Sequence, residues 1–291
     1  MTHPYGDPLY AEALSAIGPA VMLPEWGSFA LVRPLPGGAG EDATGPYPRT
    51  PIAADADLAA GLARLAAEGL VSAVFVPDPL ASPDPARLAA AFGLCRPFKT
   101  HLTIERARGY EPTRHHRDRI RRGHRRCRVE RVDLAAAMPD WRRLYGGLVE
   151  RHGIAGVAAF ADPYFPTLAR TPAMVALAAY VGDEIAAMTI WFEHAGVAVS
   201  HLTAADALGY ANGANYALND AAIAHFGDAA VIDLGGAAGA ADDASDGLFQ
   251  FKQGFANAQV TAQLCGAILD PARYAALSAG HETGFFPAYR G

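Results

Sequence analysis

The sequence of 291 residues has few cysteines and no long apolar segment. Its three cysteines, Cys95, Cys127 and Cys265, are odd in number and widely spaced, which excludes a disulfide framework and a zinc site built from Cys-x-x-Cys pairs. No apolar run approaches the roughly 18 residues that span a bilayer. The first residues lack the basic and apolar regions of a secretion signal. We therefore expect a cytoplasmic protein with no membrane span.

Lysine is nearly absent, since only Lys99 and Lys252 accompany 22 arginines. The net charge of −6 hides a strong asymmetry along the chain. Residues 106–131 carry eleven arginines and three carboxylates, a net charge of +8, while the remaining residues sum to −14. An acidic protein with one concentrated basic segment usually offers that segment to an anionic partner. The charge pattern therefore predicts such a partner.

Two signature loops of large enzyme classes are missing. The chain has no G-x-S-x-G nucleophile elbow and no G-x-x-x-x-G-K-[ST] phosphate loop, which excludes the enzyme classes built on them. With 51% hydrophobic and 19% charged residues, however, the chain has enough apolar side chains to bury a core. Its length corresponds to one large or two modest domains.

Apolar periodicity and turn residues divide the chain into alternating helices and strands. Helices are expected at 55–69, 85–92, 112–128, 134–152, 214–226 and 271–279, and strands at 28–32, 70–76, 98–104, 174–181, 184–193, 196–203, 230–234 and 258–269. The order predicts an α/β (α+β) protein with a mixed sheet and helices on both faces.

The expected helix at 112–128 carries the basic segment. A period of 3.6 places its arginines at 3- and 4-residue spacing on one face and a thin buried stripe on the other. The arginines are Arg114, Arg117, Arg121, Arg125 and Arg128, and the stripe is His116, Ile120, Gly123 and Cys127. Because glycine disfavours helix, we interpret Gly123 as a point of close approach to another element. The arginines either contact phosphates or pair with acidic residues elsewhere in the chain.

The element order resembles the GNAT acyltransferase fold, and more closely its Fem-type branch, whose members are peptidyltransferases and related enzymes built from two GNAT-like halves. Three segments carry the resemblance. They are the basic helix between the halves, the strand, glycine loop and helix of 201–226, and VIDLGGA followed by FQFKQGF, which looks like the family's Phe-Lys-x-Gly-Phe signature. The resemblance covers about residues 98–270.

The resemblance implies two GNAT-like lobes, a degenerate N-terminal lobe at 1–133 and an acyltransferase lobe at 134–291. It implies transfer of an aminoacyl or acyl group onto an amine of a small-molecule or peptide acceptor. The implied donor is aminoacyl-tRNA, bound through Arg117, Arg121, Arg125 and Arg128, with no tightly bound cofactor. The alternatives are an N-acyltransferase (for instance an N-acetyltransferase) that uses acyl-CoA and a non-catalytic RNA-binding protein of the same fold.

The segment 206–215 resembles the loop with which GNAT proteins bind donor phosphates at a helix N-terminus. Gly209, Gly213, Ala214 and Asn215 are its candidate phosphate-binding residues. Asp206 stands where the family has Gln or Arg, and its carboxylate would repel a pyrophosphate. The alternative is an ordinary connection between a strand and a helix.

Lys252 is the first candidate for the reaction centre, because the resemblance associates the matching lysine with it. An ammonium group in a partly dry site stabilises a developing oxyanion. His201 and Asp233 are further catalytic candidates. The proton acceptor stays open among Asp233, His201, Asp220 and Tyr216, with the donor phosphates or a water chain as alternatives.

The aromatic candidates for the substrate pocket are Tyr164, in the turn 162–166, together with Tyr216 and Phe251. We expect no metal site. His115, His116 and His124 lie among arginines, which repel cations. Asp242, Asp243 and Asp246 lack the spacing of a calcium loop.

Overall fold

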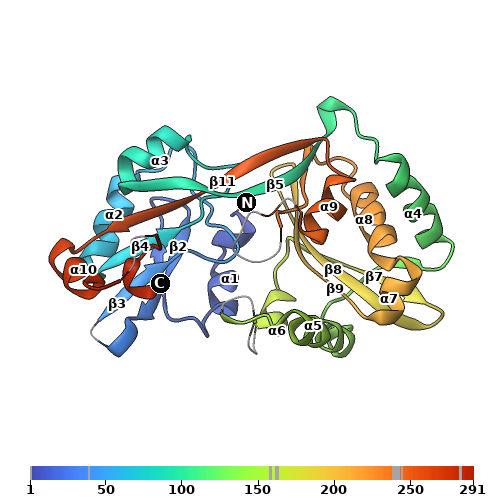
Figure 1. The fold of residues 1–291 in the computed structure, drawn as a ribbon, viewed down its shortest axis with the longest axis horizontal. Helices are drawn as coiled ribbons and strands as arrows, with labels where there is room; N and C mark the ends of the chain where they lie inside the picture. The colour runs from blue at the N-terminus through green and yellow to red at the C-terminus, as the bar shows by residue number, and fades with distance from the viewer. Residues whose placement is uncertain are drawn as a thin grey trace. The chain divides into compact units, whose positions relative to one another are not determined.

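The structure is a computed structural model, and it describes residues 2–38, 40–156, 159–160, 164–237, 243, 245–281 and 284–291. The chain forms two compact units, drawn in Figure 1. Unit 1 comprises Met1–Phe98 and Thr261–Gly291, and unit 2 comprises Lys99–Val260. The chain therefore passes between the units twice, in strands β5 (Leu94–Glu105) and β11 (Ala258–Ile268). Neither crossing coincides with the boundary at residue 133 that the sequence analysis places.

The strands of unit 1 lie in the order β1-β2-β3-β4-β11. Strands β3 and β4 run parallel, and the other neighbouring pairs run antiparallel. The main elements are α1 (Pro8–Ala13), β1 (Ala20–Leu23), β2 (Ser28–Pro34), β3 (Glu41–Thr44), α2 (Leu58–Ala67), β4 (Ser72–Phe75), α3 (Pro85–Phe92) and α10 (Pro271–Ser278). The core contains the rings of Trp26, Phe75 and Phe92, whose centroids lie 5.1–5.9 Å apart.

The strands of unit 2 lie in the order β5-β10-β9-β8-β7-β6. Strands β9 and β10 run parallel, and the other neighbours run antiparallel. The elements are α4 (Arg114–His124), β6 (Arg128–Val132), α5 (Met138–His152), α6 (Tyr164–Leu168), β7 (Met174–Val181), β8 (Glu184–His194), β9 (Val197–Ala205), α7 (Ala207–Asn212), α8 (Ala214–His225), β10 (Val231–Asp233) and α9 (Gly247–Gln253). No helix in the described parts of either unit is long and apolar enough to cross a membrane.

The two units repeat one strand pattern. Each contains a parallel pair joined through a helix, β3-α2-β4 in unit 1 and β9-α8-β10 in unit 2. In each unit the second strand of that pair has an antiparallel partner on its other side, β11 beside β4 and β5 beside β10. Strand β5 begins in unit 1, and strand β11 begins in unit 2.

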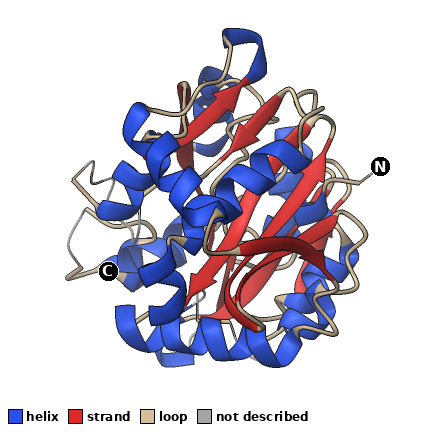
Figure 2. Cartoon of the chain, turned by 90° about the vertical axis from the view of Figure 1, so that its right-hand side faces the viewer, coloured by secondary structure: helices blue, strands red, loops and turns tan. Residues whose placement is uncertain are grey.

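The sheet of unit 2 is covered on both faces, as predicted. Side chains of a strand point alternately to opposite faces, and in β7 both series, Leu177 and Ala179 on one face and Ala176 and Ala178 on the other, are buried. Helix α8 packs against β7 and β8, and α5 packs against β8 and β9. Figure 2 draws the helices in blue and the strands in red.

The basic helix α4 is shorter than predicted. It ends at His124, with Arg125 as the C-cap, and the amides of Arg126 and Cys127 both bond to the carbonyl of Gly123. Arg128 therefore does not lie on the helix with the other arginines, because it already pairs with Tyr180 as the first residue of β6. The predicted stripe is buried, with His116, Ile120 and Gly123 on the helix and Cys127 beyond its end.

Gly123 is the close-approach point that the sequence suggests. Helix α4 packs on α8, side by side with it in Figure 1. A Cβ at Gly123 would lie 2.8 Å from the carbonyl oxygen of Gly213 and 3.2 Å from the Cβ of Ala217. A side chain at this position would therefore push the two helices apart.

We expect Gly123→Ala to destabilise the protein although alanine favours helix. The crowding costs more than the helix-propensity gain of about 1 kcal/mol, leaving a net loss of about 1–2 kcal/mol in the free energy of unfolding. The control is Gly146→Ala in α5, where a Cβ meets no atom within 4 Å. Urea unfolding measures both, and an equal gain in stability from the two substitutions would contradict the close approach.

Candidate functional site

Lys252 lies in helix α9. Asp246 caps this helix, and its carboxylate accepts the amides of Leu248 and Phe249, both at 3.0 Å. The Lys252 ammonium group donates to the carbonyl oxygen of Gly236 at 2.8 Å. Lys252, the first catalytic candidate from the sequence, thus contacts the segment that follows β10.

The other residues of Phe-Lys-x-Gly-Phe bind His116 of α4. The carbonyl of Phe251 accepts a hydrogen bond from His116 Nε2 at 2.8 Å, and the ring of Phe255 meets the imidazole edge-on at 4.8 Å. Gly254 leaves room for the imidazole, since a Cβ there would collide with its ring. The carbonyl of Gly254 also accepts the amide of Thr113, the N-cap of α4, at 3.0 Å. These residues therefore fasten the basic helix to the helix that carries Lys252.

The folded protein favours the neutral form of His116. Its Nε2 donates to Phe251, and Nδ1 lies 3.1 Å from the Thr113 hydroxyl, which can donate to it. Burial lowers the pKa of His116 from 6.5, the hydrogen bond to Phe251 opposes this shift, and the nearby His115 adds to it. The burial, with 6% of the residue exposed, identifies His116 as a docking residue.

Asp233 lies at the end of β10 and is fully buried. Its carboxylate accepts the amide of Gly235 at 2.7 Å and lies 3.0 Å from Nδ1 of His101 in β5. His101 could not be identified from the sequence, because the pairing of β5 with β10 joins residues more than 100 positions apart. The only signal available was a histidine in a predicted strand, which does not point to a partner.

Both lysines of the chain meet the turn after β10. Lys99 donates to the carbonyl of Ala237 at 2.8 Å, next to the carbonyl of Gly236 that Lys252 binds. The turn needs its glycines. Gly235 has φ +76°, and a Cβ at Gly236 would lie 2.7 Å from the carbonyl oxygen of Thr100. Residues 238–242 and 244, including Asp242 of the rejected calcium loop, lie outside the described residues.

His201 lies on β9 beyond the last residue paired with β10, since that pairing ends at Val199 opposite Asp233. The hydroxyl of Tyr164 lies 2.7 Å from His201 Nε2. Tyr164 is 1% exposed, and the ring of Phe160 stacks on it at 3.9 Å. Residues 162 and 163, the first two of the expected turn, lie outside the described part.

The three aromatic pocket candidates fall into two groups. Tyr216 and Phe251 contact each other at 4.9 Å, and both contact His116. Tyr164 instead contacts His201. The rings of Tyr216 and Phe251 pack against the core of unit 2. Their role as a joint substrate-pocket lining therefore stays a prediction.

The expected glycine loop is largely helical. Residues 207–212 form α7, because Asp206 caps it by accepting the amide of Gly209 at 2.9 Å. A Cβ at Gly209 would collide with the carbonyl of Ala186, and the amide of Gly213 bonds to Tyr210 at 3.2 Å. The amides of both glycines are thus occupied. For Ala214 and Asn215, the first residues of α8, donor binding stays a prediction.

The arginines of α4 lie at the surface. Arg117 pairs with Glu111 and Arg121 pairs with Asp118, all within the basic segment. Arg128 pairs with Glu130, and its guanidinium lies over the ring of Tyr180 at 4.4 Å. The remaining exposed arginines have no ion-pair partner among the described residues, and they are Arg114, Arg119, Arg122, Arg125 and Arg126.

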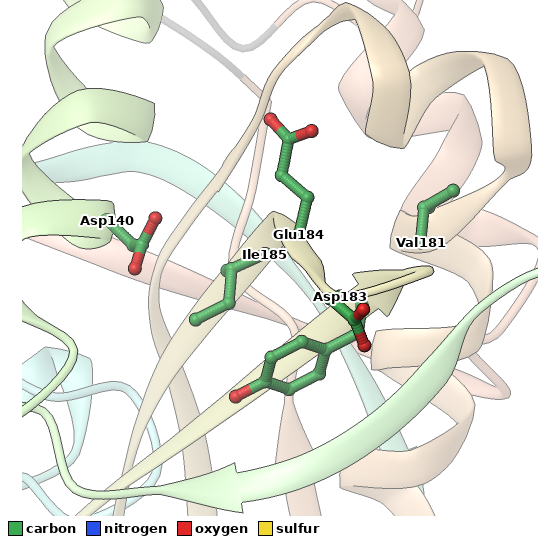
Figure 3. A pocket seen from close by; sticks show the side chains of 6 residues that line it. Asp140, Val181, Asp183, Glu184 and Ile185 are labelled. Atoms are coloured by element: carbon green, nitrogen blue, oxygen red, sulfur yellow. The ribbon is translucent and has the colours of Figure 1, made fainter.

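A depression of about 750 Å³ lies at the β7–β8 hairpin (Figure 3). It is lined by Asp140, Tyr180, Val181, Asp183, Glu184 and Ile185. None of the candidate site residues lines it. In the ranges that the structure describes, no group of three or more His, Cys, Asp or Glu side chains is arranged to hold a metal ion.

We expect the docking of α4 to weaken in mild acid. Folding favours the neutral His116 ring, so the unfolded chain binds the proton more readily. The free energy of unfolding then falls as the pH drops below 6.5 toward the lowered pKa of the folded protein.

The measurement compares wild type with His116→Gln, which keeps a donor for the Phe251 carbonyl but does not titrate. Urea unfolding at pH 7.5 and 5.5 should show that the stability advantage of wild type over the variant shrinks at the lower pH. An advantage of the same size at both values would contradict the assignment.

No protein-family model and no curated protein sequence matches this chain. Among solved structures, FemX matches with a TM-score of 0.68 and 13% identity, over 94% of this chain and 95% of FemX. The C-terminal domain of a putative lysylphosphatidylglycerol synthetase from Agrobacterium fabrum matches with a TM-score of 0.63 and 16% identity, over 93% and 90%. The Fem-type fold predicted from the sequence is therefore confirmed.

Proposed function

We propose that this protein transfers an aminoacyl group from aminoacyl-tRNA onto an amine of a small-molecule or peptide acceptor. One observation carries the proposal: the basic helix α4 is docked through His116 onto α9, the helix that bears Lys252. A polyanion held by α4 is thereby brought to the element that carries the charge needed for acyl transfer.

The exposed arginines of α4 support phosphate binding rather than internal neutralisation. The ion pairs of Arg117 and Arg121 are with exposed carboxylates close in sequence. Such surface pairs contribute about 0–1 kcal/mol, so a phosphate can replace them. Arg125 and its unpaired neighbours offer further donors. The pairing with distant acidic residues that the alternative interpretation requires is not observed for these arginines in the described ranges.

The geometry around Asp206 favours tRNA over coenzyme A as the donor. In a GNAT-type site the pyrophosphate would bind free amides before a helix. Here the Asp206 carboxylate takes the amide of Gly209, and Arg143 neutralises that carboxylate at 2.8 Å. The Asp206 carboxylate thus occupies the position at the N-terminus of α7 where a phosphate would bind.

The likeness to FemX and to a lysylphosphatidylglycerol synthetase domain supports acyl transfer on this fold. In the reaction the amine attacks the acyl ester, and negative charge develops on the carbonyl oxygen. The Lys252 ammonium group is the cation that we assign to this charge, since a preorganised donor stabilises it most strongly in a partly dry site.

Charge reversal on α4 tests the donor. Arg121→Glu/Arg125→Glu should weaken charged-tRNA binding and lower the magnitude of the salt slope, d log K/d log[salt], by about 2, because two phosphate contacts are lost. The control, Arg64→Glu/Arg96→Glu, reverses two exposed arginines of unit 1. Filter binding at two or more salt concentrations measures both. Equal affinity for the two variants would contradict a role of α4.

Substitution of Lys252 separates catalysis from binding. We expect Lys252→Ala to slow transfer about 100- to 1,000-fold, the cost of one lost oxyanion donor, while the Kd for charged tRNA stays unchanged. Single-turnover transfer measures the rate. Unchanged biological activity in Lys252→Ala, combined with its loss on charge reversal of α4, would instead indicate a non-catalytic RNA-binding protein.

A further inference from the structure

His101 and Asp233 form a buried histidine–carboxylate pair in unit 2. The imidazole Nδ1 lies 3.0 and 3.2 Å from the two carboxylate oxygens. Asp233 is completely buried, whereas the His101 side chain keeps 13% of its surface exposed. A buried carboxylate needs a partner that donates hydrogen bonds, and His101 together with the amide of Gly235 supplies them.

The pair fixes the tautomer of the histidine. An ionised carboxylate only accepts hydrogen bonds, so Nδ1 of His101 carries the proton. In the neutral ring Nε2 is then the basic nitrogen. A histidine oriented in this way by a carboxylate can take up a proton during a reaction and return it afterwards.

The turn after β10 connects the pair of His101 and Asp233 to Lys252. Asp233 and Gly236 lie three residues apart, and Lys252 donates to the carbonyl of Gly236. The Asp233 carboxylate bonds to the amide of Gly235, so the turn is held from within. On its other side the turn bonds to β5, where the amide of Leu102, next to His101, donates to the carbonyl of Gly235 at 3.1 Å. The structure thus links a cation suited to an oxyanion with a base suited to an amine.

We propose that His101 is the proton acceptor of the transfer reaction and that Asp233 is its positioning residue; this rests on the proposed function. The neutral amine attacks the carbonyl carbon of the ester, a C–N bond forms, and the carbonyl electron pair moves to oxygen beside Lys252. Nε2 of His101 takes the proton from the attacking nitrogen. When the intermediate collapses, the C–O bond breaks and the leaving tRNA hydroxyl oxygen receives that proton, so amine and ester become amide and alcohol.

Other candidate bases fit less well. Asp220 is paired with His124 at 2.8 Å and has 35% of its side chain exposed. Tyr216 packs in the ring cluster around His116. His201 lies in a separate aromatic group with Tyr164 and Phe192. None of these three is linked to Lys252 by the turn, as His101 and Asp233 are.

The first test does not depend on the donor. Diethyl pyrocarbonate acylates an unprotonated imidazole nitrogen, and mass spectrometry locates the product. We expect labelling of His101 in the wild type and a several-fold slower labelling in Asp233→Asn, because the amide no longer holds the proton on Nδ1. The exposed His115 serves as the internal control in both proteins. Labelling of His101 that is absent, or insensitive to Asp233→Asn, would overturn the proposal.

The second test uses the transfer reaction. His101→Ala should lower kcat about 100- to 10,000-fold, the usual contribution of a general base. Its Kd for charged tRNA should stay unchanged, and imidazole in the buffer should restore part of the rate. Imidazole should not restore Lys252→Ala, and His225→Ala, at an exposed position at the end of α8, should behave as wild type. A His101→Ala protein with the wild-type rate would overturn the proposal.

The two tests separate this proposal from the proposed function. If the wild type transfers nothing from charged tRNA, the aminoacyl donor is wrong, and the labelling of His101 still decides whether a carboxylate-oriented base exists. If the wild type transfers and imidazole does not rescue His101→Ala, the aminoacyl transfer stands and the role of His101 is wrong.

Discussion

The site of unit 2 depends on the docking of one histidine ring. The imidazole of His116, a residue of α4, lies against Gly254 and donates a hydrogen bond to the carbonyl of Phe251. This contact holds together the basic surface and the lysine that we place at the reaction centre, because both partners of the contact belong to those two helices. Helix α4 carries five arginines, and the buried ring of His116 and the close approach at Gly123 attach it to unit 2.

Much of the fold could be predicted because the spacing of apolar residues indicates the helices and strands. The strands at β7, β8 and β9 and the helix α3 lie within a few residues of their expected positions, and Gly123 was identified as a close approach. Hydrophobic periodicity does not predict helix caps, and it does not predict strands that pair with distant parts of the chain. Asp206 caps the helix α7 where the sequence predicts a loop. Strands β5 and β11 continue from one unit into the other and pair with strands more than 100 residues away, which local periodicity does not predict. The same limit explains why His101 was missed while Asp233 and Lys252 were found.

The residues of the Phe-Lys-x-Gly-Phe segment contact two different parts of unit 2. Its aromatic rings and its glycine contact His116 of α4, and the pocket role of Phe251 stays a prediction. Its lysine faces the turn after β10 and meets the neighbours of Asp233. In the function that we propose, this short motif couples donor binding to chemistry. The pair of Tyr164 and His201 lies in a separate aromatic group and has its own place on β9.

The central claim is that the donor is a charged tRNA and not coenzyme A. The most direct measurement is the thermal unfolding of the wild-type protein with aminoacyl-tRNA and, in parallel, with acyl-CoA, each at low and high salt. A ligand that binds the folded state raises Tm, and arginine–phosphate contacts weaken steeply as salt rises. We predict a rise in Tm with aminoacyl-tRNA that vanishes at high salt, and no shift with acyl-CoA. A rise with acyl-CoA and none with tRNA would contradict the account.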